Sequence, residues 1–292
     1  MQLHAPVNTK PLHSDFVKEV DIRVSERLED PDTIRQLKDA WHSSPVLIFR
    51  RQILTEEELV SFSTDFGECE IVSRKDILSP YRPEIIYFST LRYADGRNVG
   101  GFAGGEDVDW HSDQTFRPEP ATGAILYAVE VPRDGGDIYW ADQYGAYARL
   151  PQDVKQLIEG RTGRYRYAKR LTIMNAAELK GSAAELAKAP DVFHPVVLQH
   201  PKTGRKSLYA DPTTLVSIEG LSQAENDRVL PLLFEAGGDP SLVYQHKVMP
   251  GDIMMWDNGC TMHRRDPMRL DQPRLMKRTT FRLPREEYCV PH

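Results

Sequence analysis

Three residues of this chain have the types and the spacing of a metal site. His111 and Asp113 form a His-x-Asp pair, and His263 lies far along the chain. Two imidazoles and one carboxylate on one side of an ion are the ligand set that proteins use for non-haem Fe(II), because this arrangement leaves the opposite coordination positions open. A cosubstrate and O2 can bind there. The pattern predicts that His111, Asp113 and His263 are metal ligands and catalytic residues.

These ligands need strands to position them. Alternate side chains of a strand project from one side, so an extended segment lets His111 and Asp113 grip one ion together. The third ligand must come from a second strand. His263 follows residues 251–258, an apolar run that ends in a polar turn, as a short buried strand would. We therefore expect distant strands to meet at the site.

The rest of the chain reads as short strands with a few helices. Helical spacing with start and stop signals predicts helices over 30–41, from Thr55 to Gly67, over 142–160 with a break at Pro151, and over 222–235. Short apolar runs bounded by turn residues predict strands at 46–49, 85–88, 123–129, 138–140, 194–198, 207–209, 242–248, 251–256 and 274–283.

Turn residues suggest how some of these strands are connected. Residues 132–136 would join 123–129 and 138–140 in one hairpin, and residues 201–205 would join 194–198 and 207–209 in another. Eight or so short strands favour a sandwich or barrel in which early and late strands can meet. We expect a mainly β fold with flanking helices (α+β), and a jelly roll would bring His263 to the His111 pair.

Composition limits the kinds of partner. The chain has 292 residues and no stretch that resembles a linker, which predicts a single domain over residues 1–292. Its net charge of −6 argues against nucleic acid and anionic membranes, which attract basic surfaces. We find no signal peptide or membrane-spanning run and expect a cytoplasmic protein.

Its 3 cysteines are too few for a disulfide framework and are expected to be free thiols. A homo-oligomer stays open.

Two segments are candidates for lids over the site, namely 73–105 and 161–190. Residues 93–109, directly before His111, are rich in glycine and charge, as in a flap or a surface loop. The second segment begins with the basic residues Arg161, Arg164, Arg166, Lys169 and Arg170. In an acidic protein such residues suit a solvated face or the attraction of an anionic substrate.

Several ordered motifs resemble one known family. They are residues 110–116 (WHSDQTF), 124–126 (AIL), 135–137 (GGD), 194–197 (HPVV) with 204–206 (GRK), and 256–258 (WDN) before His263. Together, from about Ser44 to Leu283, they resemble the taurine and chlorophenoxyacetate dioxygenases of the TauD/TfdA family. The resemblance implies a cupin-like double-stranded β-helix and an oxygenase that uses Fe(II), 2-oxoglutarate and O2 to hydroxylate or desaturate a small anionic molecule, with release of succinate and CO2.

The resemblance also assigns roles to two arginines. Arg274 and Arg278 follow His263 by eleven and fifteen residues, the positions where this family holds the far carboxylate of 2-oxoglutarate and an acidic substrate. A guanidinium fork suits a carboxylate. One residue departs from the pattern: Ile138 stands where the family commonly has Thr, whose hydroxyl contacts the same 2-oxoglutarate carboxylate. Related halogenases lack the carboxylate of Asp113, so its presence favours hydroxylation or desaturation.

Other functions stay open at this point. The same chemistry serves oxidative decarboxylation or desaturation of a modified amino acid in secondary metabolism. From other classes, a cupin-like metal-dependent hydrolase or isomerase would use the three ligands without O2, and a silent binding protein would need no metal for ligand affinity. Neither needs Arg274 or Arg278, so these arginines favour the oxygenase. The sequence does not identify the substrate.

Overall fold

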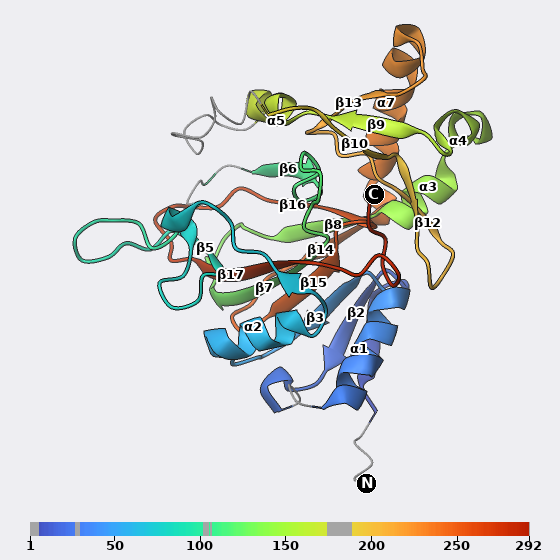
Figure 1. Ribbon diagram of the computed structural model, residues 1–292. Coiled ribbons are helices and arrows are strands. Elements are labelled where there is room, and N and C mark those ends of the chain that lie inside the picture. Colours follow the sequence, from blue (N-terminus) through green and yellow to red (C-terminus); the bar gives the residue numbers. More distant parts are fainter. Residues whose placement is uncertain (1–5, 27–29, 102–104, 106, 174–188, 292) are drawn as a thin grey trace.

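Two facing sheets form the body of the protein (Figure 1). The computed structural model describes residues 6–26, 30–101, 105, 107–173 and 189–291. The larger sheet has eight strands, and β5 (Ile86–Ser89) joins it by pairing with β17. The other seven lie in the order β1 (Asn8–His13), β2 (Val17–Asp21), β3 (Val46–Phe49), β15 (Ile253–Asp257), β7 (Gly123–Glu130), β17 (Leu275–Arg282) and β4 (Glu68–Cys69).

The smaller sheet carries the two histidines of the predicted metal site. Its four strands lie in the order β14 (Val243–His246), β8 (Ile138–Asp142), β16 (Thr261–Arg265) and β6 (Val108–His111). Alternate residues of both sheets point into a shared core that includes Leu126, Trp140, Met254, Trp256 and Met276. Strands from the beginning, middle and end of the chain thus enclose one interior, and this confirms the predicted jelly roll.

One predicted hairpin is wrong. β7 pairs with β15 and β17 in the larger sheet, whereas β8 pairs with β14 and β16 in the smaller one. The intervening turn, in which Gly135 and Gly136 both have a φ of +76°, takes the chain from one sheet to the other. Both strands contribute to the shared core, so they face each other across roughly 10 Å of side chains instead of pairing at about 4.8 Å.

Helices cover the outer face of the larger sheet (Figure 1). α1 (Pro31–Ser43) and α2 (Glu56–Thr64) pack through Leu37, Trp41, Leu59 and Phe62 against strand residues such as Phe281. Thr55 with Glu58 forms the predicted capping box on α2, and Asp30 caps α1. Short 3-10 turns occur at η1 (Val24–Glu26), η2 (Lys75–Ile77) and η4 (Pro240–Leu242).

A third layer lies beside the smaller sheet and has its own apolar core. The predicted break at Pro151 separates α3 (Gln143–Arg149) from α4 (Gln152–Ile158), and the second predicted hairpin is present as β11 (Val197–Gln199) with β12 (Lys206–Leu208). The capping box of Ser222 and Glu225 starts α7 (Gln223–Gly237). The layer also contains β9 (Thr162–Tyr165), β10 (Val192–Pro195), β13 (Leu215–Ile218) and α5 (Tyr167–Ile173).

Regular structure runs through both segments that the sequence suggested as lids. Within 73–105, β5 is a strand of the larger sheet with Ile86 and Tyr87 buried. Within 161–190, β9 pairs with β10 and β13, and α5 follows it. Residues 102–104, 106 and 174–188 lie outside the described residues. These strands belong to the framework, and the role of the two segments as lids stays a prediction.

The state of the cysteines and the polarity of the helices match the expectations from composition. Cys69, Cys260 and Cys289 are free thiols, as predicted. Among the residues described, the helices are all too short or too polar to cross a bilayer.

His200 fastens the turn between β11 and β12. Its Nδ1 accepts hydrogen bonds from the backbone N–H groups of Lys202 and Thr203 at 3.1 and 3.3 Å. Its Nε2 lies 3.4 Å from Nδ1 of His42 on α1, so a neutral His200 that is protonated on Nε2 satisfies all three contacts. Burial, together with the neighbouring charge on His42, lowers the pKa of His200 to about 4.

This buried histidine should make the protein sensitive to acid. The unfolded chain takes up a proton at His200 near pH 6.5, whereas the folded protein stays neutral there until about pH 4. The unfolded state therefore binds more protons in this window, and the free energy of unfolding should fall as the pH is lowered through it. Urea unfolding at pH 7 and pH 5 should show a smaller loss in His200→Gln than in wild type. Equal losses would contradict the assignment.

Candidate metal centre

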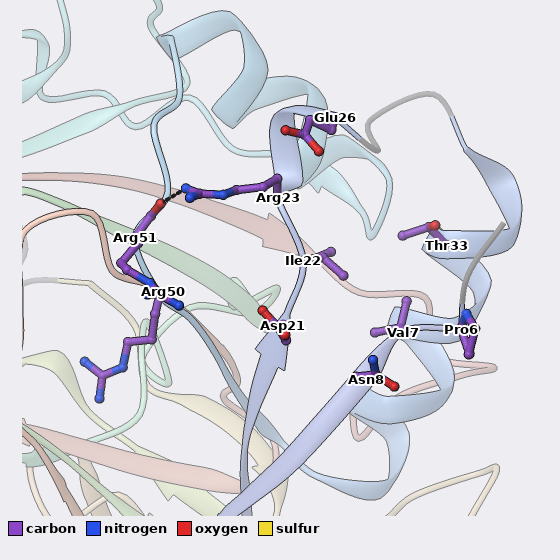
Figure 2. Close-up of a pocket in the computed structure, with 10 residues that line it drawn as sticks. All are labelled: Pro6, Val7, Asn8, Asp21, Ile22, Arg23, Glu26, Thr33, Arg50 and Arg51. Carbon is purple, nitrogen blue, oxygen red and sulfur yellow. Dashed lines mark hydrogen bonds between the residues drawn. The ribbon is translucent and has the colours of Figure 1, made fainter.

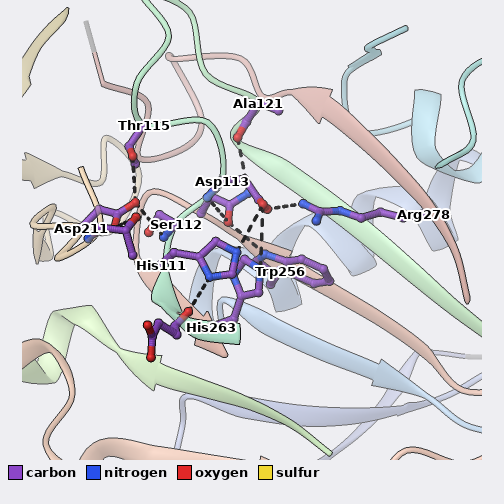
Figure 3. Close-up of polar contacts among 12 residues, drawn as sticks. His111, Ser112, Asp113, Thr115, Ala121, Asp211, Trp256, His263 and Arg278 are labelled. Carbon is purple, nitrogen blue, oxygen red and sulfur yellow. Dashed lines mark hydrogen bonds and ion pairs between the residues drawn. The ribbon is translucent and has the colours of Figure 1, made fainter. Parts of the chain in front are cut away.

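The three predicted ligands converge on one buried point (Figure 3). His263 on β16 stands directly opposite His111 on β6 in the antiparallel register, and their ring centroids are 4.2 Å apart. One ligand atom from each residue can be chosen so that all three lie within 4.8 Å of one another. The Oδ1 atom of Asp113 is 3.9 Å from Nε2 of each histidine.

Asp113 arrives by a different route from the one expected. β6 ends at His111, and Asp113 lies in the turn that follows the strand. The turn bends sharply, since the next residue, Gln114, has a φ of +55°. The backbone N–H of Asp113 points to Oδ1 of Asn258 at 3.4 Å. Turn geometry, rather than strand alternation, places the carboxylate beside the two imidazoles.

Local contacts orient the rings toward the shared point. Nδ1 of His111 lies 2.7 Å from the carbonyl oxygen of Asp109, which leaves Nε2 to face Asp113. The ring of His263 packs 4.9 Å from the ring of Trp256. Nδ1 of His263 is buried and has no hydrogen-bond partner among the described residues. Each histidine therefore presents Nε2 to the centre, as ligands of one ion would.

Burial and charge set the protonation of the ligands. Burial is the main reason that the pKa of His111 falls to about 3 and that of His263 to about 4. The charge of Arg170 lowers both values further. Burial acts to raise the pKa of Asp113, but the charges of Arg278 and the two histidines outweigh it and keep that pKa low. Neutral imidazoles beside a carboxylate are ready to bind a cation at neutral pH.

Of the two predicted arginines, Arg278 lies on β17 and Arg274 lies directly before that strand. The guanidinium of Arg278 donates a hydrogen bond to Oδ2 of Asp113 and lies 5.2 Å from the ring of Trp256. Arg274 is only 5% exposed, and no carboxylate of the described chain lies within ion-pair distance of it. Burial, with a contribution from the charge of Arg265, lowers the pKa of Arg274 to about 9. Arg274 is thus a buried cation with no anionic partner among the described residues.

Ile138 lines the same interior. It is buried at the start of β8 and belongs to the core cluster that contains Met276, which lies between Arg274 and Arg278 in the sequence. The hydroxyl that the family commonly places at this position is replaced here by an apolar side chain.

Two further residues support the turn that carries Asp113, and the sequence indicated only one of them. Asn258 belongs to the 256–258 motif and was expected to support the ligands from a turn; its Oδ1 atom also accepts a hydrogen bond from Nε1 of Trp256 at 3.0 Å. Asp211 reads as part of a loop before Pro212, yet it is buried beside the turn that carries Asp113. The contact between Asp211 and Ser112 joins residues that are far apart in the chain, so it leaves no local sequence pattern.

A cavity of about 370 Å³ near the start of the chain is separate from this centre (Figure 2). It is lined by Pro6, Val7, Asn8, Asp21, Ile22, Arg23, Glu26, Thr33, Arg50 and Arg51. None of the residues at the candidate metal centre lines it, so we do not assign it to the reaction.

A jelly roll that brings two histidines and one carboxylate to a buried point is the architecture of a mononuclear non-haem metal enzyme. The family model described as "Taurine catabolism dioxygenase TauD, TfdA family" matches residues 8–280. The chain therefore belongs to the TauD/TfdA family, as its motifs predicted.

Individual relatives support the same family assignment. The (S)-phenoxypropionate/alpha-ketoglutarate-dioxygenase of Sphingobium herbicidovorans is 34% identical over 82% of this chain and 83% of its own length. The alpha-ketoglutarate-dependent 2,4-dichlorophenoxyacetate dioxygenase of Cupriavidus pinatubonensis is 32% identical over 94% and 97%. The crystal structure of AAD-2 in complex with Mn(II) and N-oxalylglycine matches with a TM-score of 0.77 at 28% identity, covering 97% of this chain and 99% of that one. The chain is an Fe(II)- and 2-oxoglutarate-dependent dioxygenase.

Proposed function

We propose that His111, Asp113 and His263 hold Fe(II), that Arg274 binds the far carboxylate of 2-oxoglutarate, and that Arg278 binds the anionic group of a small organic substrate. The observation that carries the proposal is the convergence of three ligand atoms within 4.8 Å, with the guanidinium of Arg278 in contact with the ligand carboxylate. The products of the cosubstrate are succinate and CO2.

The residues fit the proposed metal. Two neutral nitrogens and one carboxylate oxygen match the donors that Fe(II) takes in such sites, whereas a thiolate would favour softer metals. Cys260, three residues before His263, is a buried free thiol and is absent from the ligand group. Bound Fe(II) supplies the activation of O2 that couples decarboxylation of 2-oxoglutarate to oxidation of a substrate C–H bond.

Arg274 supports the binding of a dicarboxylate. Its guanidinium has no acidic partner in the described part of the chain, so a ligand carboxylate would supply the missing charge through two parallel hydrogen bonds. Because residue 138 is isoleucine, no threonine hydroxyl shares this task at that position. We therefore expect the affinity for 2-oxoglutarate to depend mainly on Arg274.

Arg278 would orient the substrate close to the metal. It already contacts Asp113, so an anion held by its remaining N–H groups would lie next to the ligand carboxylate. Nε of Arg278 is buried and has no hydrogen-bond partner among the described residues. This unmet donor favours an anionic ligand. The relatives named for phenoxypropionate and 2,4-dichlorophenoxyacetate are consistent with a small organic carboxylate as substrate.

One residue of the predicted basic segment supports the same preference. Arg164 and Arg166 pair with Asp191. The charge of Arg170, by contrast, acts on both ligand histidines. Arg170 therefore adds positive potential near the metal, which favours a negatively charged substrate.

Substrate-dependent formation of succinate tests the proposal. Anaerobically purified protein is loaded with Fe(II) and 2-oxoglutarate, then exposed to O2 with (S)-2-phenoxypropionate, 2,4-dichlorophenoxyacetate or taurine, and with the amides of the two carboxylates. We expect at least one anion to stimulate succinate formation, and the matched neutral amide to stimulate it far less. Stimulation by amides as strong as by acids would contradict the anionic substrate. Hydrolysis or isomerisation without 2-oxoglutarate or O2 would contradict the oxygenase.

Other parts of the sequence-based prediction stay predictions. They are the cytoplasmic location, the absence of nucleic-acid and membrane partners, the single domain over 1–292 and the homo-oligomer that the sequence left open. The choice between hydroxylation and desaturation also stays open, and the carboxylate of Asp113 supports either outcome over halogenation.

A further inference from the structure

Asp211 lies beside the metal centre without being one of its ligands (Figure 3). It belongs to the loop between β12 and β13, about a hundred residues after the turn that carries Asp113. Its side chain is buried, with 1% exposure. A carboxylate at this depth is costly unless its oxygens are fully hydrogen-bonded.

Both oxygens of Asp211 are occupied by donors, and the donors divide into two pairs. Oδ2 accepts from the backbone N–H of Ser112 at 3.4 Å and from the hydroxyl of Thr115 at 2.8 Å. Oδ1 accepts from the backbone N–H of Thr213 at 2.7 Å and from its hydroxyl at 2.7 Å. One oxygen therefore holds the metal-ligand turn and the other holds Asp211's own loop.

Ser112 is the residue between two metal ligands. Its backbone N–H points to Asp211, and its hydroxyl donates to the carbonyl oxygen of Thr261, two residues before His263. The orientation of the 111–113 backbone is thus fixed against the strand that carries the third ligand. A change in that orientation would move Nε2 of His111 and Oδ1 of Asp113 relative to each other.

We propose that Asp211 is a positioning residue for the metal centre, which holds the turn between His111 and Asp113 in the shape that lets both side chains bind one ion. The inference rests on the metal site proposed above. It assigns to a loop residue, distant in sequence, the task of ordering the ligand turn before the metal arrives.

The donor pattern explains why a carboxylate stands here and predicts that asparagine cannot replace it. An asparagine has one acceptor oxygen and one NH2 group. In either orientation, the NH2 group would face a backbone N–H, either that of Ser112 or that of Thr213. A hydroxyl can rotate to accept, but a backbone N–H cannot, so one side of the network must open.

Asp211 also connects the metal-ligand turn to α5. The hydroxyl of Thr213 lies 3.4 Å from Nη1 of Arg170 on that helix. The rings of Phe116, in the metal-ligand turn, and Tyr167, on α5, are 4.4 Å apart and give a second contact between these segments. Oδ2 of Asp211 contacts the turn that carries Asp113, and Oδ1 contacts Thr213, which in turn contacts α5. Substitutions of Thr115 and Thr213 can therefore test the two sets of contacts separately.

Metal affinity without turnover tests the inference. Binding of Mn(II) is measured by the electron paramagnetic resonance signal of the free ion, with wild-type protein and with Asp211→Asn, Thr115→Val and Thr213→Val. Asp211→Asn should weaken Mn(II) binding by about 10- to 100-fold, the usual effect of losing a residue that orients metal ligands. Thr115→Val removes a donor on the metal side and should also weaken binding. Thr213→Val removes a matched hydroxyl on the other side and should leave it within about twofold.

The outcomes separate positioning from a general loss of stability. The melting temperature of each variant is also measured. If Asp211 positions the ligands, the order of Mn(II) affinities among the variants should differ from the order of their melting temperatures. Unchanged Mn(II) binding in Asp211→Asn, or equal weakening in Thr115→Val and Thr213→Val, would overturn this inference alone. If Asp211→Asn does not fold, the comparison of the two threonine variants decides. Failure of wild-type protein to bind Mn(II) would overturn the proposed metal site as well.

Discussion

Replacing His263 by alanine is expected to remove the bound metal and to lower substrate-dependent succinate formation at least about 1000-fold. Half of the nitrogen donors would be lost, and Oδ1 of Asp113 and Nε2 of His111 would be left as an incomplete face that cannot retain Fe(II). Metal content after gel filtration and the initial rate of succinate formation are the two measurements. Both should fall together, because the metal centre is required for every turnover.

The matched control for this variant is His13→Ala. His13 is a partly exposed histidine at the end of β1 that contacts the ring of Phe16 and lies outside the ligand group. It should keep metal content and rate near the wild-type values. Retention of stoichiometric metal and of substantial rate by His263→Ala would show that the third ligand has been assigned to the wrong residue.

Replacing Arg274 by alanine should separate the binding of 2-oxoglutarate from the binding of metal. The loss of two charge-assisted hydrogen bonds to the far carboxylate is expected to raise the KM for 2-oxoglutarate by about 100-fold. Metal content should be unchanged. Arg278 forms an ion pair with Asp113, whereas Arg274 forms no ion pair with any of the three metal ligands. Initial rates over a range of 2-oxoglutarate concentrations, together with metal analysis, check both parts.

Arg269→Ala provides a control of equal charge change. Arg269 lies five residues earlier, is exposed and pairs with Asp271, so its loss should leave the KM for 2-oxoglutarate within about twofold. A parallel loss of metal in Arg274→Ala would mean that Arg274 supports the fold of the site rather than the cosubstrate. An unchanged KM would mean that another donor holds the far carboxylate.

Local features of the fold were predictable because their causes are local. The caps at Thr55 and Ser222 follow from side-chain oxygens that satisfy the first free N–H groups of a helix, within three residues of sequence. The break at Pro151 follows from a backbone nitrogen that cannot donate. The metal ligands were recognisable for a similar reason, since His111 and Asp113 form a short motif and His263 lies in a recognisable context.

Features that depend on the whole fold were less predictable. The turn at Gly135 and Gly136 has hairpin residues, yet each neighbouring strand finds its partners in a different sheet. The same turn residues can connect two strands of one sheet or two strands of different sheets. Which connection forms therefore depends on the arrangement of the whole fold. Asp211 was missed because its partners Ser112 and Thr115 lie about a hundred residues away. A lone aspartate before proline is an ordinary turn residue until the fold brings a second turn against it.

The most direct test of the account is the position of a metal in crystals. Anomalous scattering from protein crystallised with Mn(II) in place of Fe(II) should give one strong peak, within bonding distance of Nε2 of His111, Oδ1 of Asp113 and Nε2 of His263. A strong peak bound by other residues, with these three side chains unliganded, would contradict the assignment of the metal centre and the roles proposed for the residues around it.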